Sequence, residues 1–398
     1  MRVALLLSLS AISAAALVAP SLAQAPLTFA DLTGRALQSP AETETEELLA
    51  TASRAAVGGN SFLAGGITAG LAAGPRARGR SGSASDASMS VEVPLRRARG
   101  ERKALAEHVG AVAGPLRAAA AALARVELAR ALVDAWLAQE LLDIREQDLV
   151  VVESWLSASR RRVEAGADPP FEPTLVAGER DRALVELMVA RRQVELTWGE
   201  LAARADLPAA KQPLSLAGLP ARRAAPPPSG AAPDIPPRIA AALAARRDLL
   251  MQLAKVEAGG PRSRWAIAGE AAREGEDHYA HLGVAYRFPL RDETAAIAES
   301  ERAAQLRAER DAVRQRAALQ AALAAALTAV SSAPATLADT DIEKAQTALT
   351  VRLNEGKERA SEILPLRRQL LEARVAILTA RAARHAAGAE LFFLLGDD

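Results

Sequence analysis

Two stretches that interrupt long helical segments share one pattern, and this repetition constrains the fold more than any other feature of the chain. RVEAGADPPFE at residues 162–172 and RLNEGKERASE at residues 352–362 each place Gly four residues after Arg and Glu six residues after that Gly. Around each stretch, apolar residues recur at the spacings of three and four that are typical of amphipathic helices. We therefore infer two helical hairpins, turning at Gly166 and Gly356, that arose by tandem duplication.

Each copy also contains two short segments with the alternation of β-strands. Apolar residues alternate with small, polar or charged ones from Met89 to Val93 and again from Leu282 to Phe288. We expect strands over about residues 60–71, 87–95, 263–272 and 279–290. The stretch AAGPRARGRSGSAS between the first two strands reads as a polar loop. Each copy is thus helix, β-hairpin, long helix, break and returning helix.

The helices expected in the first copy lie at about residues 32–57, 97–165 and 173–205. Those of the second copy lie at about residues 238–258, 293–355 and from the Gly356 break to about residue 394. Gly114-Pro115 is expected to kink the first long helix, and Pro334 to interrupt the second.

The first residues have the features of a secretory signal peptide. Arg2 precedes an apolar run, and Ser21-Leu22-Ala23 fits the small-x-small cleavage rule. Pro20 interrupts the apolar run, which argues against the alternative of an uncleaved membrane anchor. The expected organisation is a signal peptide at 1–23, a first repeat at 24–206, a Pro-rich linker at 207–236 and a second repeat at 237–398.

Composition excludes several classes of function. Lys and Arg number 49 against 48 Asp and Glu, and aromatic residues are 3%, so nucleic acid is not an expected partner. The sequence has no phosphate-binding GKS or GKT loop and no G-x-S-x-G motif, so we expect no enzyme activity and no cofactor. With no cysteine and only four histidines, no dedicated metal site is expected, although His278 and His281 flank a strand start.

The alternating strands point to a membrane barrel shared between chains. An outward apolar face with aromatic residues is typical of barrel strands about 10 residues long. Four strands cannot close a barrel, so chains must pool them: two chains give 8 strands and three give 12, enough to leave a lumen. The alternative is a soluble β-sandwich on a coiled-coil rod. The expected lipid-facing residues are Val91, Val93, Trp265, Leu282, Val284, Tyr286 and Phe288.

In its layout the chain resembles the TolC-like outer-membrane efflux ducts. The resemblance rests on LTFADLTGRAL near the mature start, on VPL at 93–95 and FPL at 288–290, and on R-x-x-x-G at both helix breaks. The stretch YAHLGVAYRFPLRDETAAIAESERAAQLRAERDAV is similar to the branch that serves cobalt-zinc-cadmium and copper/silver pumps. The resemblance implies a mainly α fold with a 12-strand membrane β-barrel, forming a homotrimeric outer-membrane duct with a helical periplasmic tunnel. It also implies docking on a periplasmic adaptor and an inner-membrane resistance-nodulation-division pump.

The resemblance assigns roles to residues at the two helix breaks. The family's hairpin tips, which meet the adaptor, map to Arg162, Val163, Gly166, Arg352, Leu353 and Gly356. Candidate gate carboxylates at this end are Asp168, Glu355 and Glu358; solvated tip charge is the alternative for each of them. Pro169-Pro170 departs from the family pattern and stiffens the first turn.

The sequence therefore predicts the outer-membrane exit duct of a tripartite efflux system that passively exports heavy-metal cations. One alternative is a duct for drugs or small organic molecules. Another is a secreted structural coiled-coil protein without a channel.

Overall fold

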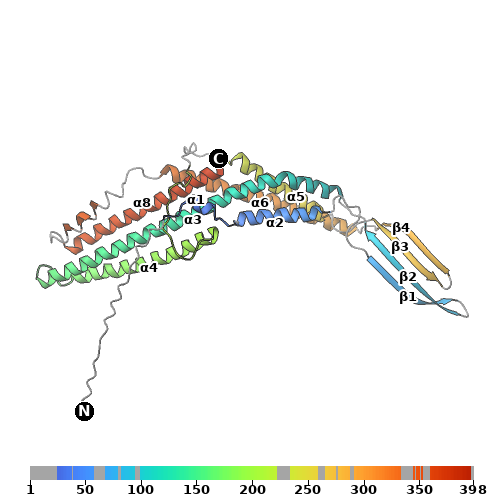
Figure 1. The fold of residues 1–398 in the computed structure, drawn as a ribbon, viewed down its shortest axis with the longest axis horizontal. Coiled ribbons are helices and arrows are strands. Elements are labelled where there is room, and N and C mark those ends of the chain that lie inside the picture. Colours follow the sequence, from blue (N-terminus) through green and yellow to red (C-terminus); the bar gives the residue numbers. More distant parts are fainter. Residues whose placement is uncertain are drawn as a thin grey trace, which may run out of the picture.

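The protein is an elongated helical body with a β-sheet at one end (Figure 1). The computed structural model describes residues 25–37, 39–57, 68–78, 82–94, 99–221, 234–258, 265–274, 277–286, 291–332, 344–345, 347–349, 351–352 and 359–395. The helices are α1 (Phe29–Thr33), α2 (Pro40–Ala56), α3 (Arg99–Glu164), α4 (Glu172–Ala205), α5 (Pro237–Ala258), α6 (Arg291–Ser332) and α8 (Ala360–Leu395). The strands are β1 (Thr68–Arg78), β2 (Gly82–Pro94), β3 (Trp265–Glu274) and β4 (Asp277–Tyr286).

All four strands form one antiparallel sheet in the order β1-β2-β3-β4. The first hairpin comes from the first repeat and the second from the second repeat, so β2 and β3 join the two halves at the centre of the sheet. Strands β1 and β4 are its edges. The described chain thus forms an open sheet rather than a closed barrel.

In the helical body, α3 packs against α2 and α5 in the half near the sheet, and against α4 and α8 in the far half. Helix α6 packs against α5 and α8. Separate clusters of buried residues lie along the described body: Leu49, Leu105 and Leu249 near the sheet, Leu132 and Leu391 in the centre, and Trp155 and Ile363 toward the far end. Alanine at many contact positions lets the helices approach closely.

The helix expected over residues 32–57 is two helices, and this prediction was wrong in detail. Helix α1 ends at Thr33, and a new helix starts after Ser39. The Ser39 hydroxyl accepts a hydrogen bond from the Glu42 N–H at 3.2 Å, and the Glu42 carboxylate accepts one from the Ser39 N–H at 3.0 Å. This capping box, followed by Pro40 at the first helical position, specifies a helix start.

The first β-hairpin is longer toward its tip than expected. Residues 72–78 and 82–85, which the sequence predicts as a polar loop, belong to strands β1 and β2. Pairing over 11 residues, from Thr68–Glu92 to Arg78–Gly82, outweighs the turn preference of Gly and Arg. Strand β4 ends at Tyr286, short of the expected residue 290, and the residues that follow lie outside the described part of the chain.

Helix α3 continues through Pro115 as a single 66-residue helix. By length and composition, its stretch Gly100–Glu164 is the one described helix apolar enough to cross a membrane. We assign it to the helical body because it packs against five other described helices, α1, α2, α4, α5 and α8. Pro334 and the expected signal peptide at 1–23 fall outside the described residues.

Candidate functional site: the hairpin tip and the sheet

The α3–α4 turn lies at the end of the molecule farthest from the sheet (Figure 1). Gly166 has a φ of +71°, which a glycine adopts without the clash that a Cβ would cause. The Ala167 N–H donates to the Arg162 carbonyl at 2.8 Å, and the Gly166 N–H donates to the Val163 carbonyl at 2.9 Å. These two bonds are a Schellman motif, so the R-x-x-x-G pattern encodes the helix C-terminus itself.

The side chains of this turn also form an ion pair. The Arg162 guanidinium contacts both oxygens of Asp168, each at 2.8 Å, and the Asp168 side chain is only 3% exposed. This ion pair, with its one hydrogen bond, joins residues six positions apart, so it braces the turn. Asp168, a candidate gate carboxylate, is thus neutralised by Arg162 in this structure.

A buried carboxylate connects the first tip to the second hairpin. Glu172, the first residue of α4, is fully buried. Its oxygens accept hydrogen bonds from the Ser361 hydroxyl at 2.8 Å and from the Ser361 N–H at 3.1 Å. Because Ser361 lies in the first turn of α8, Glu172 also satisfies an otherwise unpaired helix N-terminus.

Further from the tip, a cluster of charged residues joins α3, α4 and α8. Arg367 of α8 is 4% exposed and forms an ion pair with Asp148 of α3. Its other nitrogen lies 3.5 Å from Glu179 of α4, which also binds Arg368 at 2.6 Å. The Arg367 guanidinium lies over the ring of Trp155, 5.6 Å from its centroid. Burial raises the pKa of the Asp148 carboxyl, and the Arg367 charge opposes that rise.

The second tip is only partly described. Arg352 lies in a short helical piece at 351–352, whereas Leu353, Glu355, Gly356 and Glu358 fall outside the described residues. Arg359, just beyond them, donates its N–H to the Glu362 carboxylate at 3.3 Å at the start of α8. Among the described residues, no group of three or more His, Asp or Glu side chains is arranged to hold a metal ion.

The strand register places the expected lipid-facing positions on one face of the sheet. Val93 lies opposite Ile267, which lies opposite Val284, and Trp265 lies opposite Tyr286. Directly opposed residues share a face, so these positions form rows across the sheet. Leu282 and Val284 are 84% and 65% exposed. Phe288 lies outside the described residues, and of Val93, Trp265 and Tyr286 only the backbone is described.

Solved structures with the same architecture include outer-membrane channels. The chain aligns over 92% of its length with 84% of the Campylobacter jejuni CmeC outer membrane channel, at 11% identity and a TM-score of 0.62. It aligns over 92% of its length with 92% of a Pseudomonas aeruginosa membrane protein, at 15% identity and a TM-score of 0.61. For the Vibrio cholerae outer membrane protein VceC, the values are 92% of this chain, 96% of that chain, 17% identity and 0.55.

The chain has a TolC-like fold. No protein-family model matches its sequence. No curated protein matches it either. At these identities the similarity establishes the fold alone. It does not show whether the chain belongs with heavy-metal channels or with channels for other cargo.

Two residues at this end of the molecule were not predicted from the sequence. In the sequence, Glu172 is only part of the repeated pattern, six residues after Gly166, and no pattern marks Arg367. The repeat pattern does contain a signal for Glu172, because its counterpart Glu362 also lies in the first turn of a helix. Arg367 has no such signal, because its burial depends on how α3, α4 and α8 pack together.

Proposed function

We propose that this protein is a passive exit duct in the bacterial outer membrane. The observation that carries this proposal is the four-stranded open sheet, with exposed Leu282 and Val284 on one face, at the end of long helical hairpins. An apolar sheet face and two unpaired sheet edges are costly in water. In a bilayer, the apolar face meets lipid and the edges pair with other copies.

The duct is a homotrimer in this proposal. Three chains supply 12 strands, which leave a lumen, whereas two supply 8 and give a barrel filled by side chains. The N-terminal 1–23 serves as the export signal, so the helical body occupies the periplasm. No catalytic step is involved, and transport energy comes from an inner-membrane pump of the resistance-nodulation-division type.

The hairpin tips contact the periplasmic adaptor. Gly166 leaves the backbone of its turn accessible, and the region around residues 352–356 serves in the same way on the second hairpin. For the gate, Glu355 and Glu358 are the better candidates, because the Asp168 carboxylate is engaged by Arg162. Three copies of one carboxylate around an axis would favour cations.

The cargo in this proposal is a heavy-metal cation, on the strength of the stretch at 279–313 that is similar to metal-efflux ducts. A drug or small organic molecule is the second candidate, because the shared outer-membrane channel fold does not distinguish between cargoes.

The test uses the native host or a duct-deficient strain that expresses the full chain. We expect the protein in the outer-membrane fraction, migrating as a trimer in SDS without heating and as a monomer after boiling. Deletion should sensitise cells to divalent or monovalent heavy-metal salts and leave drug sensitivity unchanged. If the deletion strain is sensitised to drugs but not to metal salts, the cargo is a drug or small organic molecule. If the protein is recovered as a soluble periplasmic monomer, it is not a duct.

A further inference from the structure

The acidic residues of the four strands all belong to one face of the sheet. Directly opposed residues share a face, so the register defines an outward face, which includes Leu282 and Val284, and an inward face behind it. The outward face comprises the odd-numbered residues of β1, β2 and β3 and the even-numbered residues of β4. The five acidic residues of the described strands lie on the inward face: Asp86, Glu92, Glu270, Glu274 and Asp277.

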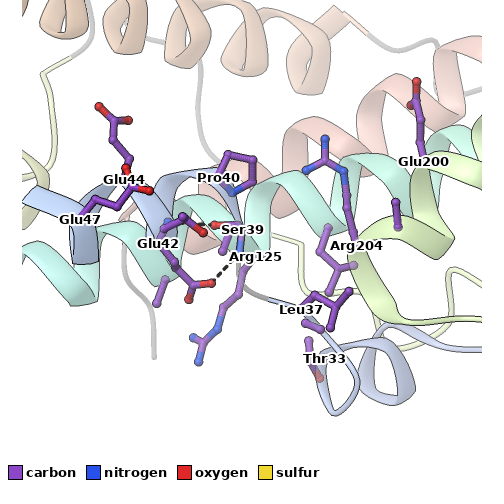
Figure 2. A pocket seen from close by; sticks show the side chains of 16 residues that line it. Thr33, Leu37, Ser39, Pro40, Glu42, Glu44, Glu47, Arg125, Glu200 and Arg204 are labelled. Atoms are coloured by element: carbon purple, nitrogen blue, oxygen red, sulfur yellow. Dashed lines mark hydrogen bonds between the residues drawn. The ribbon is translucent and has the colours of Figure 1, made fainter.

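The helical body mixes its charges instead. In the groove between α2, α3 and α4, the carboxylates of Glu44, Glu47 and Glu200 lie with the guanidinium groups of Arg125 and Arg204 (Figure 2). A surface in water carries both signs together at little cost, because water and salt screen them. The restriction of every described strand carboxylate to the inward face therefore indicates that the two faces of the sheet meet different surroundings.

Two basic residues interrupt the otherwise uncharged outward face. Arg273 of β3 and His278 of β4 lie directly opposite each other in the register. Both are next to the turn of the second hairpin, at the end of the sheet away from the helical body (Figure 1). Within the described strands, they are the only Arg, Lys, His, Asp or Glu positions on this face.

The pair lies at one boundary of an apolar band. At the other boundary, next to the helical body, Trp265 is opposite Tyr286. The outward positions of β3 and β4 between these two rows are apolar or small: Ile267, Gly269, Ala271, Ala280, Leu282 and Val284. The eight residues from Trp265 to Arg273 span about 27 Å along the strand, or about 20 Å of height at the tilt of barrel strands, close to the apolar band of a membrane barrel.

We propose that Arg273 and His278 form a binding site for the phosphate groups of outer-leaflet glycolipids, at the outer boundary of the barrel. The inference rests on the proposed duct, in which the helical body occupies the periplasm and the hairpin turns reach the outer surface. It adds a partner, an anionic lipid headgroup, and the position at which that partner binds.

Phosphate is the ligand that suits this pair. A guanidinium binds two phosphate oxygens at once through parallel N–H donors, and an imidazole adds a further N–H donor. Directly opposed positions lie about 5 Å apart, so two basic groups at such positions can serve one phosphate. Like charges opposite each other are unfavourable without a counter-charge, and the described outward face holds no carboxylate. A lipid phosphate supplies the negative charge.

The test uses the full-length protein, purified in detergent as the SDS-resistant trimer. Native mass spectrometry measures the binding of bisphosphorylated lipid A, and the temperature at which the trimer dissociates in SDS gives a second readout. We expect bisphosphorylated lipid A to bind and to raise this temperature, and dephosphorylated lipid A to bind roughly tenfold more weakly. Equal binding of the two lipids would overturn the proposal.

A free-phosphate arm identifies the source of the phosphate. Inorganic phosphate, at the same phosphate concentration, should neither raise the dissociation temperature nor displace the lipid, because the acyl chains hold the headgroup at the boundary. If inorganic phosphate displaces the lipid, the pair binds free anions and the lipid assignment is wrong.

A pair of double variants assigns the site to the outward face. Arg273→Gln with His278→Gln should weaken the binding of bisphosphorylated lipid A roughly tenfold, whereas Arg273→Lys should retain most of it. The control is Arg76→Gln with Arg78→Gln, which removes two basic residues at the same end of the sheet but on the inward face. The control should bind within about twofold of the unmodified chain. Equal losses from the two double variants would reject the assignment.

The outcomes separate this proposal from the proposed function. The comparison of the two lipids uses the unmodified chain, so it decides the proposal even if a variant fails to assemble. A trimer recovered from the outer membrane that shows no preference for the phosphorylated lipid would reject the lipid site and leave the duct standing. Absence of any trimer in the unmodified chain would reject both.

Discussion

At the scale of single residues, the first hairpin tip depends on one glycine and two carboxylates. Gly166 supplies a left-handed backbone, Asp168 braces the turn through Arg162, and Glu172 fastens α4 to the start of α8. The repeated sequence pattern predicted the glycine turn. It did not predict that Asp168 would be buried, because the ion pair depends on the path of the chain after Gly166.

Gly166→Ala should destabilise the tip by about 1–2 kcal/mol, because a Cβ is unfavourable at a φ of +71°. Gly178→Ala is the matched control: Gly178 lies within α4, and no atom comes within 4 Å of an added Cβ. This control should instead stabilise the helix by about 0.5–1 kcal/mol. Hydrogen exchange of the amides at residues 163–168 measures the effect of Gly166→Ala, and exchange within α4 measures the effect of Gly178→Ala. Equal effects of the two changes would contradict the left-handed requirement.

Arg367→Met should destabilise the far half of the body by about 3–5 kcal/mol at neutral pH, because it leaves Asp148 buried without its counterion. Arg368→Met is the control. It should lower the stability by less than about 1 kcal/mol, because the Arg368 side chain is 44% exposed. Chemical unfolding of the detergent-solubilised protein, followed by the helical circular dichroism signal, compares the two variants.

The Arg367→Met defect should also depend on pH. Burial raises the folded-state pKa of Asp148, so the stability linked to this carboxyl is greatest below its unfolded pKa and is lost as pH rises through the folded value. Removing Arg367 raises that pKa further. The variant should therefore lie closer to the wild type at pH 5 than at pH 7.5. A defect that grows on acidification would contradict the assignment.

At the scale of elements, the face of the sheet on which a strand residue lies determines which substitutions the β-hairpins tolerate. If the proposed duct is correct, Leu282→Arg should reduce recovery of assembled protein from the outer membrane, because a charge on a lipid-facing barrel position costs about 2–4 kcal/mol near the bilayer centre. Glu270→Arg is the control, since Glu270 lies on the opposite face and already carries a charge. Heat-modifiable migration on gels quantifies assembly. Equal losses from both variants would mean that neither face meets lipid.

How far the sequence predicts an element depends on whether its signal is local. The capping box at Ser39 is a local signal, and a closer reading of Ser-Pro-Ala-Glu could have placed the break before α2. The extension of β1 through Arg76 to Arg78 is not local, because those residues become strand only when β2 pairs with them. Likewise, the burial of Arg367 needs three helices in place before it can be recognised.

At the scale of the whole molecule, the two repeats should associate without a covalent connection. Residues 1–221 and 234–398 meet through nine paired positions between β2 and β3 and through α3 against α5 and α8. Co-expression of these two pieces, each with the N-terminal export segment, should restore SDS-resistant assembly in the outer membrane. Either piece alone should be degraded, because its central strand and helix face stay uncovered. If the two co-expressed pieces do not assemble, the linker has a role beyond connecting the two repeats.

The open sheet edges have a consequence for biogenesis. In the proposed duct, each newly exported chain would expose β1 and β4 as unpaired strand edges before it meets other copies. A head-to-tail contact that misses closure by a few degrees grows into a filament instead of a ring. When synthesis exceeds membrane insertion, ring closure would therefore compete with open-ended polymerisation. Periplasmic chaperones that cover the strand edges would favour ring closure.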